Sequence, residues 1–239
     1  MASARIGLRG RKGIFGVLLV AVLLLLLYYR LQLVDSGSAS SKAKVLEGGE
    51  TVKLVAKVIV EVYFSSLCPD STLFFAEQLV PFWRTRFHNF VQLVLVPYGK
   101  ASFATDRQGK TTFLCQHGPD ECYLNKAMTC AIELLQPDVT DTLKIISCLQ
   151  GSEPKNVLKC TANTKLTTAQ MQKCIDGQTG DDMLKRMGKK TDSVGKKLLY
   201  IPTIYINGRA NKNAEFHLHA ELCKVLPVRE RKLCLEHKV

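Results

Sequence analysis

The amino-acid sequence predicts an α/β fold that is interrupted by a helical insertion. Two short apolar runs, at residues 57–64 and 91–97, flank a segment with helical periodicity. A further apolar run at residues 197–208 and a helical pattern at residues 214–225 follow near the end of the chain. Between these two parts, residues 111–195 have helical patterns and contain six of the nine cysteines.

The first part predicts a βαβ unit. Residues 57–64 are rich in β-branched and aromatic side chains, which is typical of a strand buried on both faces. Apolar residues then recur at helical spacing from Leu73 to Phe87, where Pro81 is expected to bend the helix. Residues 91–97 form a second buried strand, so we expect two parallel strands joined by a right-handed crossover.

The rest of the chain predicts an insertion followed by a ββα unit. Helices are expected in the insertion near residues 121–135, 141–149, 167–175 and 181–188. The strand at 197–208 ends in Asn207-Gly208, a hairpin turn signal, and a short strand near 209–212 and a helix at 214–225 follow. This order predicts a thioredoxin-like fold with a disulfide-rich helical insertion at about residues 111–195.

Residues 1–34 are expected to be a targeting segment. Four basic residues precede an uncharged run from Ile14 to Tyr29. The run fits a signal peptide, but it reaches about twenty-one residues if Arg30 snorkels, which is long enough for a membrane-spanning signal anchor. In either case the folded part is delivered to a lumen or the exterior, as a secreted or luminal protein or, with an uncleaved anchor, as a single-pass type II membrane protein. Residues 35–52 are expected to be a linker, and residues 53–239 the folded domain.

The positive charge of the chain does not indicate a nucleic-acid site. Residues 1–44 carry half of the formal net charge of +12, and no basic stripe interleaved with aromatic residues follows. A solvated basic surface explains the remainder better. We expect no nucleic-acid partner, no cofactor and no metal ion, and contact with a membrane only if the N-terminal segment is an uncleaved anchor.

Cys68 is the predicted reactive residue. Nine cysteines in a chain delivered to an oxidising compartment predict a disulfide framework, and the odd number leaves one thiol over. Cys68 lies where a buried strand turns into a helix, and Pro69 suits the first helical position. The unpaired N–H groups and the helix dipole favour its thiolate, whereas Asp70 opposes it. The alternative is a structural Cys68 paired with another cysteine.

Ser71 occupies the second position of a Cys-x-x-Cys spacing. A cysteine at this second position would resolve the mixed disulfide formed by the first cysteine. A serine hydroxyl cannot attack a disulfide, but it can donate a hydrogen bond to the thiolate. Activation of Cys68 is then kept and self-resolution is lost.

Pro202 is unusual because it lies within an apolar strand, at Tyr200-Ile-Pro-Thr203. If the Ile201–Pro202 bond is cis, this backbone lies beside the thiol and leaves main-chain groups for an extended substrate. If it is trans, the proline opens an edge strand. The sequence leaves both alternatives open.

Two segments resemble a known family. Cys115-Gln-His-Gly-Pro-Asp-Glu-Cys122, with Asn125 and Cys130 after it, resembles the signature of the gamma-interferon-inducible lysosomal thiol reductase family. Residues 68–71 lie where that family has its Cys-x-x-Cys site. Residues 200–208 look like its proline strand, and Cys223 and Cys234 look like its C-terminal cysteine pair.

The resemblance implies a thioredoxin-like fold and reduction of protein disulfides in endosomes or lysosomes, with some members secreted and some linked to host defence. It implies that Cys68 is the nucleophile and Pro202 the substrate-side proline. Ser71 departs from the reductase pattern and puts dithiol turnover in doubt. The sequence also has no Asn-x-Ser/Thr sequon, so it offers no acceptor for lysosomal delivery through N-glycans.

The spacing of the cysteines also predicts how they pair. A helical hairpin turning near Pro137 would bring together Cys130 with Cys148 and Cys122 with Cys160, and Cys115–Cys174 and Cys223–Cys234 would complete the set.

His117, between two cysteines, could be a metal ligand or a proton shuttle. Because an oxidising lumen favours disulfides over zinc sites, we interpret it as structural, holding its loop through its ring nitrogens.

Two functions follow from these residues. The first is a thiol-disulfide oxidoreductase in which Cys68 attacks a substrate disulfide and a small thiol releases the product. The second is a catalytically weak module that binds partners or traps them in mixed disulfides. The expected partners are disulfide-bonded proteins and a small-thiol reductant.

Overall fold

The computed structural model describes residues 22–26, 28, 57–195, 198, 200–227, 230, 231 and 234. The chain divides into two units, Met1–Lys53 and Leu54–Val239. In the first unit, residues 22–26 and 28 are helical. No helix within the described ranges has the length and apolar character needed to cross a membrane. The predicted linker at 35–52, the other residues of the segment 1–34 and the predicted domain start at 53–56 lie outside these ranges.

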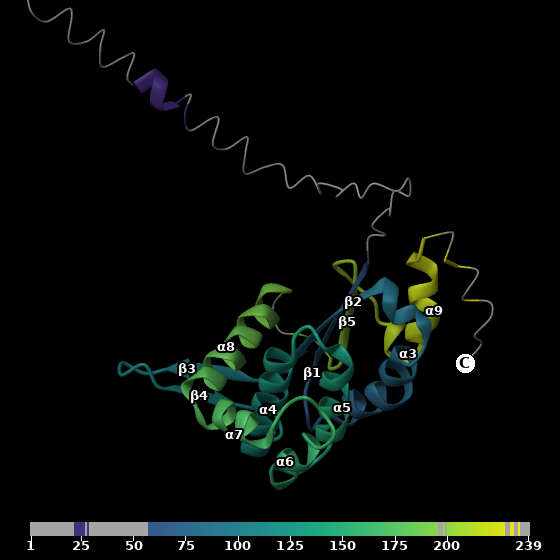
Figure 1. Ribbon diagram of the computed structural model, residues 1–239. Coiled ribbons are helices and arrows are strands. Elements are labelled where there is room, and N and C mark those ends of the chain that lie inside the picture. Colours follow the sequence, from purple (N-terminus) through teal and green to yellow (C-terminus); the bar gives the residue numbers. More distant parts are fainter. Residues whose placement is uncertain are drawn as a thin grey trace, which may run out of the picture. The chain divides into compact units, whose positions relative to one another are not determined.

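The second unit is built on a four-stranded sheet (Figure 1). The strands lie in the order β2-β1-β5-β6, with bounds β1 Val58–Phe64, β2 Val91–Pro97, β5 Thr203–Ile206 and β6 Arg209–Ala210. β1 and β2 are parallel, with Val58 opposite Val91. β5 is antiparallel to both β1 and β6. The predicted βαβ unit is therefore confirmed. The hairpin is confirmed too, but its first strand is shorter than the predicted 197–208, because β5 begins only after Pro202.

A continuous helical segment follows β1. It consists of α2 (Pro69–Phe74), a π-helical turn η1 (Phe75–Leu79) and α3 (Val80–Trp83), and a 3₁₀ helix η2 (Arg86–Phe90) leads into β2. The N–H of Val80 donates to the carbonyl of Phe75, five residues earlier. Pro81 has no N–H to donate, so the irregularity expected there takes the form of one π-helical turn beside it.

The insertion is helical, as predicted. It contains α4 (Pro119–Leu135), α5 (Val139–Leu149), η3 (Pro154–Asn156), α6 (Val157–Cys160), α7 (Thr168–Asp176) and α8 (Gln178–Ser193). α4 is central to it, because α5, α7 and α8 all pack against α4. The predicted final helix, α9 (Ala214–Val225), packs against η1 and β5.

The sequence did not predict one hairpin, which projects beside α8 in Figure 1. It consists of β3 (Ser102–Thr105) and β4 (Thr111–Leu114). The carboxylate of Asp106 accepts the N–H groups of Gln108 and Lys110, and Gly109 has a φ of +85° that favours glycine. These strands are short and mostly exposed, so they lack the apolar pattern by which a buried strand is found.

The core lies on both faces of the sheet. On one face, Val58, Val60 and Val62 of β1 belong to a large apolar cluster with side chains from the helical segment 69–90, from α4, α5 and α9. On the other face, Tyr63 packs in a smaller cluster with Leu184 and Met187 of α8. This alternation along β1 confirms a central strand that is buried on both faces at its C-terminal end, directly before Cys68.

All eight cysteines expected in disulfides are bonded, but three of the four predicted pairs are wrong. Cys223–Cys234 is confirmed. The other bonds are Cys115–Cys122, Cys130–Cys174 and Cys148–Cys160, instead of Cys130–Cys148, Cys122–Cys160 and Cys115–Cys174. The prediction assumed that equal distance from the turn brings two residues of a helical hairpin together. Instead, Cys115 pairs with Cys122 at the start of α4, Cys130 of α4 pairs with Cys174 of α7, and Cys148 of α5 pairs with Cys160 of α6, so no disulfide joins α4 to α5.

Candidate functional site

Cys68 lies at the N-terminal end of α2. It is the cap residue of this helix, with an extended backbone, and Pro69 takes the first helical position as predicted. The carbonyl of Cys68 accepts the N–H of Thr72 at 3.1 Å and the hydroxyl of Thr72 at 3.3 Å. All nine cysteines lie in described positions, and Cys68 is the one that remains free. The alternative of a structural, paired Cys68 is therefore wrong.

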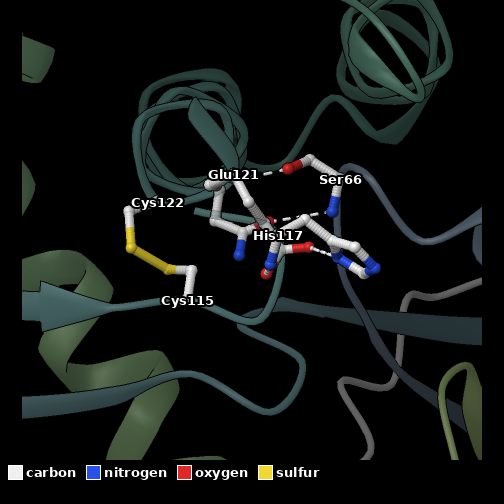
Figure 2. The surroundings of a disulfide bond; sticks show 6 residues. Ser66, Cys115, His117, Glu121 and Cys122 are labelled. Carbon is white, nitrogen blue, oxygen red and sulfur yellow. Dashed lines mark hydrogen bonds and ion pairs between the residues drawn. A yellow bond between two sulfur atoms is a disulfide. The ribbon is translucent and has the colours of Figure 1, made fainter. Parts of the chain in front are cut away.

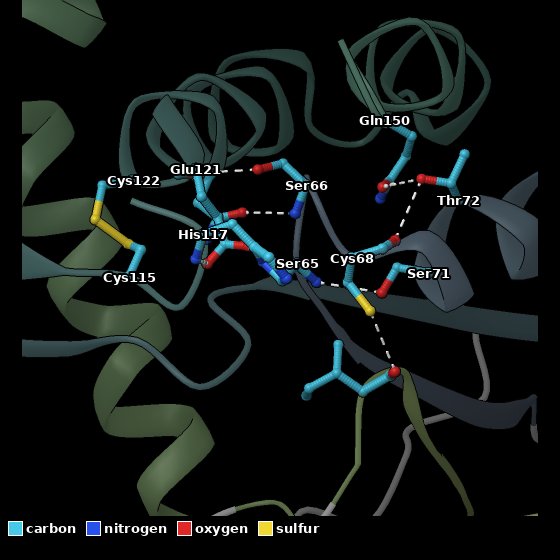
Figure 3. Close-up of polar contacts among 12 residues, drawn as sticks. Ser65, Ser66, Cys68, Ser71, Thr72, Cys115, His117, Glu121, Cys122 and Gln150 are labelled. Carbon is cyan, nitrogen blue, oxygen red and sulfur yellow. Dashed lines mark hydrogen bonds and ion pairs between the residues drawn. A yellow bond between two sulfur atoms is a disulfide. The ribbon is translucent and has the colours of Figure 1, made fainter. Parts of the chain in front are cut away.

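The sulfur of Cys68 faces the loop before β5. The thiol lies 3.4 Å from the carbonyl oxygen of Ile201, a contact that Figure 3 shows as a dashed line. The Ile201–Pro202 bond is cis, which decides between the two alternatives that the sequence left open. Pro202 is buried and leads directly into Thr203, the first residue of β5. The structure thus brings together Cys68 and Pro202, which the sequence predicted as parts of one site.

Ser71 lies one helical turn beyond Cys68 and is fully buried. Its hydroxyl oxygen accepts the N–H of Ser65 at 3.4 Å. Within the described part of the chain, no hydrogen bond joins the Ser71 hydroxyl to the sulfur, contrary to the contact expected from the sequence. The side chain therefore ties the helix to the preceding loop.

Acidic side chains lie near the start of α2 and on α9. Asp70, Glu77 and Glu215 line a small hollow together with Leu73 and Phe216. Burial raises the pKa of the Glu215 carboxyl, and the negative charge of Asp70 raises it further. Burial also raises the pKa of the Tyr200 hydroxyl, to which Glu215 adds a smaller effect.

The loop between β1 and α2 contacts the insertion. The N–H of Ser66 donates to Oδ1 of Asn125 at 2.9 Å, and the Ser66 hydroxyl donates to the carbonyl of Glu121 at 3.3 Å. Figure 2 shows Ser66 and Glu121 near the Cys115–Cys122 disulfide. Sequence reasoning assigned no role to Asn125 or Glu121, although both lie in the signature segment.

His117 lies in the loop that the Cys115–Cys122 disulfide closes. Its Nδ1 is bonded to the carboxylate of Glu121, which is fully buried, and its backbone N–H contacts the same carboxylate at 3.4 Å. The sulfurs of Cys115 and Cys122 are bonded to each other, so they are not thiolate ligands. These contacts agree with a histidine that holds its loop.

Comparisons with known proteins agree with this arrangement. The model of the gamma interferon inducible lysosomal thiol reductase (GILT) family matches residues 59–178. The protein is 31% identical to GILT-like protein 1 of Drosophila melanogaster, over 78% of this chain and 82% of that protein. The chain belongs to the GILT family.

One further relative agrees with the family, and one solved structure agrees with the fold. The gamma-interferon-inducible lysosomal thiol reductase of Carassius auratus is 33% identical, over 73% of this chain and 68% of that protein. The crystal structure of DsbA from Chlamydia trachomatis superposes with a TM-score of 0.52 at 14% identity, over 74% of this chain and 88% of the other. The GILT member described here therefore has the thioredoxin-like fold and belongs to a family of thiol oxidoreductases.

Proposed function

We propose that this GILT-family protein reduces protein disulfides, with Cys68 as its single nucleophile and a small thiol as the resolving reagent. The observation that carries the proposal is the state of the cysteines. Eight of the nine are joined in four disulfides, and the free one lies at a helix start beside Pro202. Reactive cysteines occur in such partly exposed positions at helix N-termini.

The proposed reaction begins with the Cys68 thiolate. It attacks one sulfur of the substrate disulfide, forms a mixed disulfide and releases the other substrate sulfur as a thiolate, which takes up a proton. A small thiolate such as cysteine then attacks the Cys68 sulfur and releases the second substrate thiol. A second small thiol regenerates Cys68 and leaves as the oxidised small disulfide. Two small thiols thus supply the two electrons that the substrate gains.

We place this activity in the lumen of the secretory pathway, in endosomes or lysosomes, or outside the cell. The N-terminal basic and apolar segment supports delivery to such a compartment. An uncleaved anchor would instead tether the domain as a type II membrane protein. A contribution to host defence is part of the same proposal, drawn from the resemblance to the family.

Reduction of insulin in the presence of cysteine tests the proposal. We expect the protein to accelerate the reaction above the rate of cysteine alone, and Cys68→Ala to remain at that background. Thr179→Ala, at an exposed position of α8, serves as a control that keeps the full rate. Equal rates for the protein and Cys68→Ala would exclude catalysis by this thiol.

Ser71 supports a second candidate function, the trapping of partners. Without a resolving thiol, a mixed disulfide at Cys68 persists until a small thiol reaches it. Non-reducing gels of protein expressed in cells separate the two functions. Adducts that reductant removes and that Cys68→Ala lacks favour trapping. If the protein forms no adducts and does not reduce insulin, the results favour non-covalent binding by the fold.

A further inference from the structure

The insertion contacts the short loop that carries Cys68. β1 ends at Phe64 and α2 begins at Pro69, so Ser66 lies in a loop, outside the hydrogen-bond ladders of the strand and the helix. Ser66 is nevertheless fully buried. Buried backbone N–H and carbonyl groups need hydrogen bonds.

The insertion supplies a partner for each polar group of Ser66. Its N–H donates to the side chain of Asn125, and its hydroxyl donates to the carbonyl of Glu121, both from α4. Its carbonyl accepts the N–H of Gly151 at 2.8 Å, from the residues after α5. When its amide is oriented to satisfy its hydrogen bonds, Gln150 donates to the same carbonyl at 3.1 Å.

The groups that hold Ser66 are themselves fixed. Asn125 and Glu121 are fully buried on α4. The Glu121 carboxylate is bonded to His117, whose loop is closed by the Cys115–Cys122 disulfide, as Figures 2 and 3 show. Farther along, Cys130–Cys174 fastens α4 to α7, and Cys148–Cys160 fastens α5 to α6.

We infer that the insertion acts as a clamp that positions Cys68, and that Asn125 and Glu121 are positioning residues of the thiol site. One residue, Leu67, lies between the clamped Ser66 and Cys68, which carries the sulfur. A displacement of Ser66 moves the start of α2, and with it the distance between the sulfur and the Ile201 carbonyl. The signature segment is thereby linked to the reactivity of a thiol that it does not contact directly.

Asn125→Leu tests the inference because it keeps the branched shape of the side chain, with a larger volume, and removes the acceptor. The buried N–H of Ser66 is then left without its partner. We expect the rate at which iodoacetamide alkylates Cys68 in the folded protein to change about threefold or more, because small displacements of a reacting group change rates strongly. In the insulin assay we expect kcat to fall about tenfold, with KM changed less than about twofold.

Thr129→Val is the matched control. Thr129 lies one turn farther along α4, is equally buried, and its hydroxyl donates to the carbonyl of Asn125. This variant lowers the unfolding temperature but leaves the alkylation rate and kcat near those of the unmodified protein. Ser66→Ala, which removes only the bond to Glu121, gives a smaller change in the same direction as Asn125→Leu, and it serves if Asn125→Leu does not fold.

The inference about the clamp rests on the proposed function only for the kcat measurement, because alkylation needs no substrate. If the unmodified protein does not reduce insulin, the proposed function fails and the alkylation rates still test the clamp. Alkylation rates of Asn125→Leu and Ser66→Ala that match that of Thr129→Val would overturn the inference.

Discussion

The sulfur of Cys68 and the carbonyl oxygen of Ile201 lie 3.4 Å apart, although 133 residues separate them in the sequence. The pairing of β1 with β5 accounts for this, since Tyr63 near the end of β1 lies opposite Thr203 at the start of β5. The thiol can donate to this carbonyl, whereas a thiolate cannot. In the proposed reaction, loss of the thiol proton would leave this carbonyl free to accept a backbone N–H of the substrate.

Ser71→Cys is expected to convert a thiol-dependent site into a self-resolving one. The new thiol would attack the mixed disulfide at Cys68 from within the molecule, at an effective concentration in the millimolar range. At micromolar concentrations of the small thiol, we expect the mixed disulfide to decay more than about tenfold faster. Trapping an isotope-labelled substrate and following its release measures this decay.

The matched control is Ser71→Ala, which has no second thiol and also loses the acceptor for the Ser65 N–H. It should release the trapped substrate no faster than the unmodified protein. Equal release from Ser71→Cys and Ser71→Ala would show that position 71 cannot reach the mixed disulfide.

Asp141 is expected to make the stability of the insertion depend on pH. Its carboxylate binds Lys144 at 2.7 Å and the backbone N–H of Lys165 at 2.9 Å. The hydrogen bond from Lys144, followed by the one from Lys165, holds the pKa of this carboxyl below its ordinary value of 3.8. A lowered pKa in the folded state stabilises the fold above that ordinary value, and the contribution is lost as pH falls through the folded-state pKa.

Urea unfolding of Asp141→Asn measures this effect. At neutral pH we expect the variant to be less stable by about 1 to 2 kcal/mol, through the weakened charge-assisted hydrogen bonds. The difference should shrink as pH falls below about 4, where the carboxylate is protonated first in the unfolded state and then, at lower pH, in the folded state. Asp182→Asn, at an exposed position of α8, is the control. A difference that is constant across pH would contradict the assignment.

The disulfides of the insertion are expected to differ in their contribution to stability. Cys130–Cys174 has a sequence separation of 44 and Cys148–Cys160 one of 12. In the loop-entropy description, removing the first costs about 4 kcal/mol and removing the second about 3 kcal/mol. Replacement of each pair by alanines, followed by chemical unfolding, gives the order. Peptide mapping of the unmodified protein checks the pairing itself, and a Cys130–Cys148 peptide would contradict it.

Gly180 is expected to tolerate alanine poorly because it lies against backbone. A Cβ atom at this position would collide with the carbonyl oxygen of Cys174. Cys174 is held by its disulfide to Cys130, so its carbonyl cannot easily move away from the added Cβ atom. We expect Gly180→Ala to destabilise the protein by about 2 to 3 kcal/mol, as is usual for overpacking. Thermal unfolding beside Thr179→Ala, which should be nearly neutral, tests this.

The central strands and most helices could be predicted because their apolar side chains form continuous runs or recur at helical spacing. β2 agrees with the prediction at both ends, and so does α9. The β3–β4 hairpin could not be found in this way, since its exposed strands need no apolar pattern and are set by the turn at Asp106 and Gly109. Local turn chemistry, rather than burial, determines that part of the fold.

The site was predictable only in part. The cysteine count and the strand-to-helix position pointed to Cys68, and the odd proline in an apolar strand pointed to Pro202. The clamp on Ser66 was not predictable, because hydrogen bonds between a loop and a distant helix leave no period in the sequence. Disulfide pairing failed for a related reason. Gly118, with a φ of +86°, turns the chain so that Cys122 meets Cys115 instead of a cysteine across the hairpin.

The disulfide pattern also has a consequence for the order in which the protein is made. Cys115–Cys122, Cys148–Cys160 and Cys223–Cys234 each join cysteines that are consecutive in the chain. During synthesis from the N-terminus, each of these pairs is complete as soon as its second member emerges, and short loops close at the lowest entropy cost. Cys130 is the exception, because Cys148 and Cys160 are both synthesised before its partner, Cys174. Cys68 emerges before all of them, so its freedom in the finished protein depends on later cysteines finding nearer partners first.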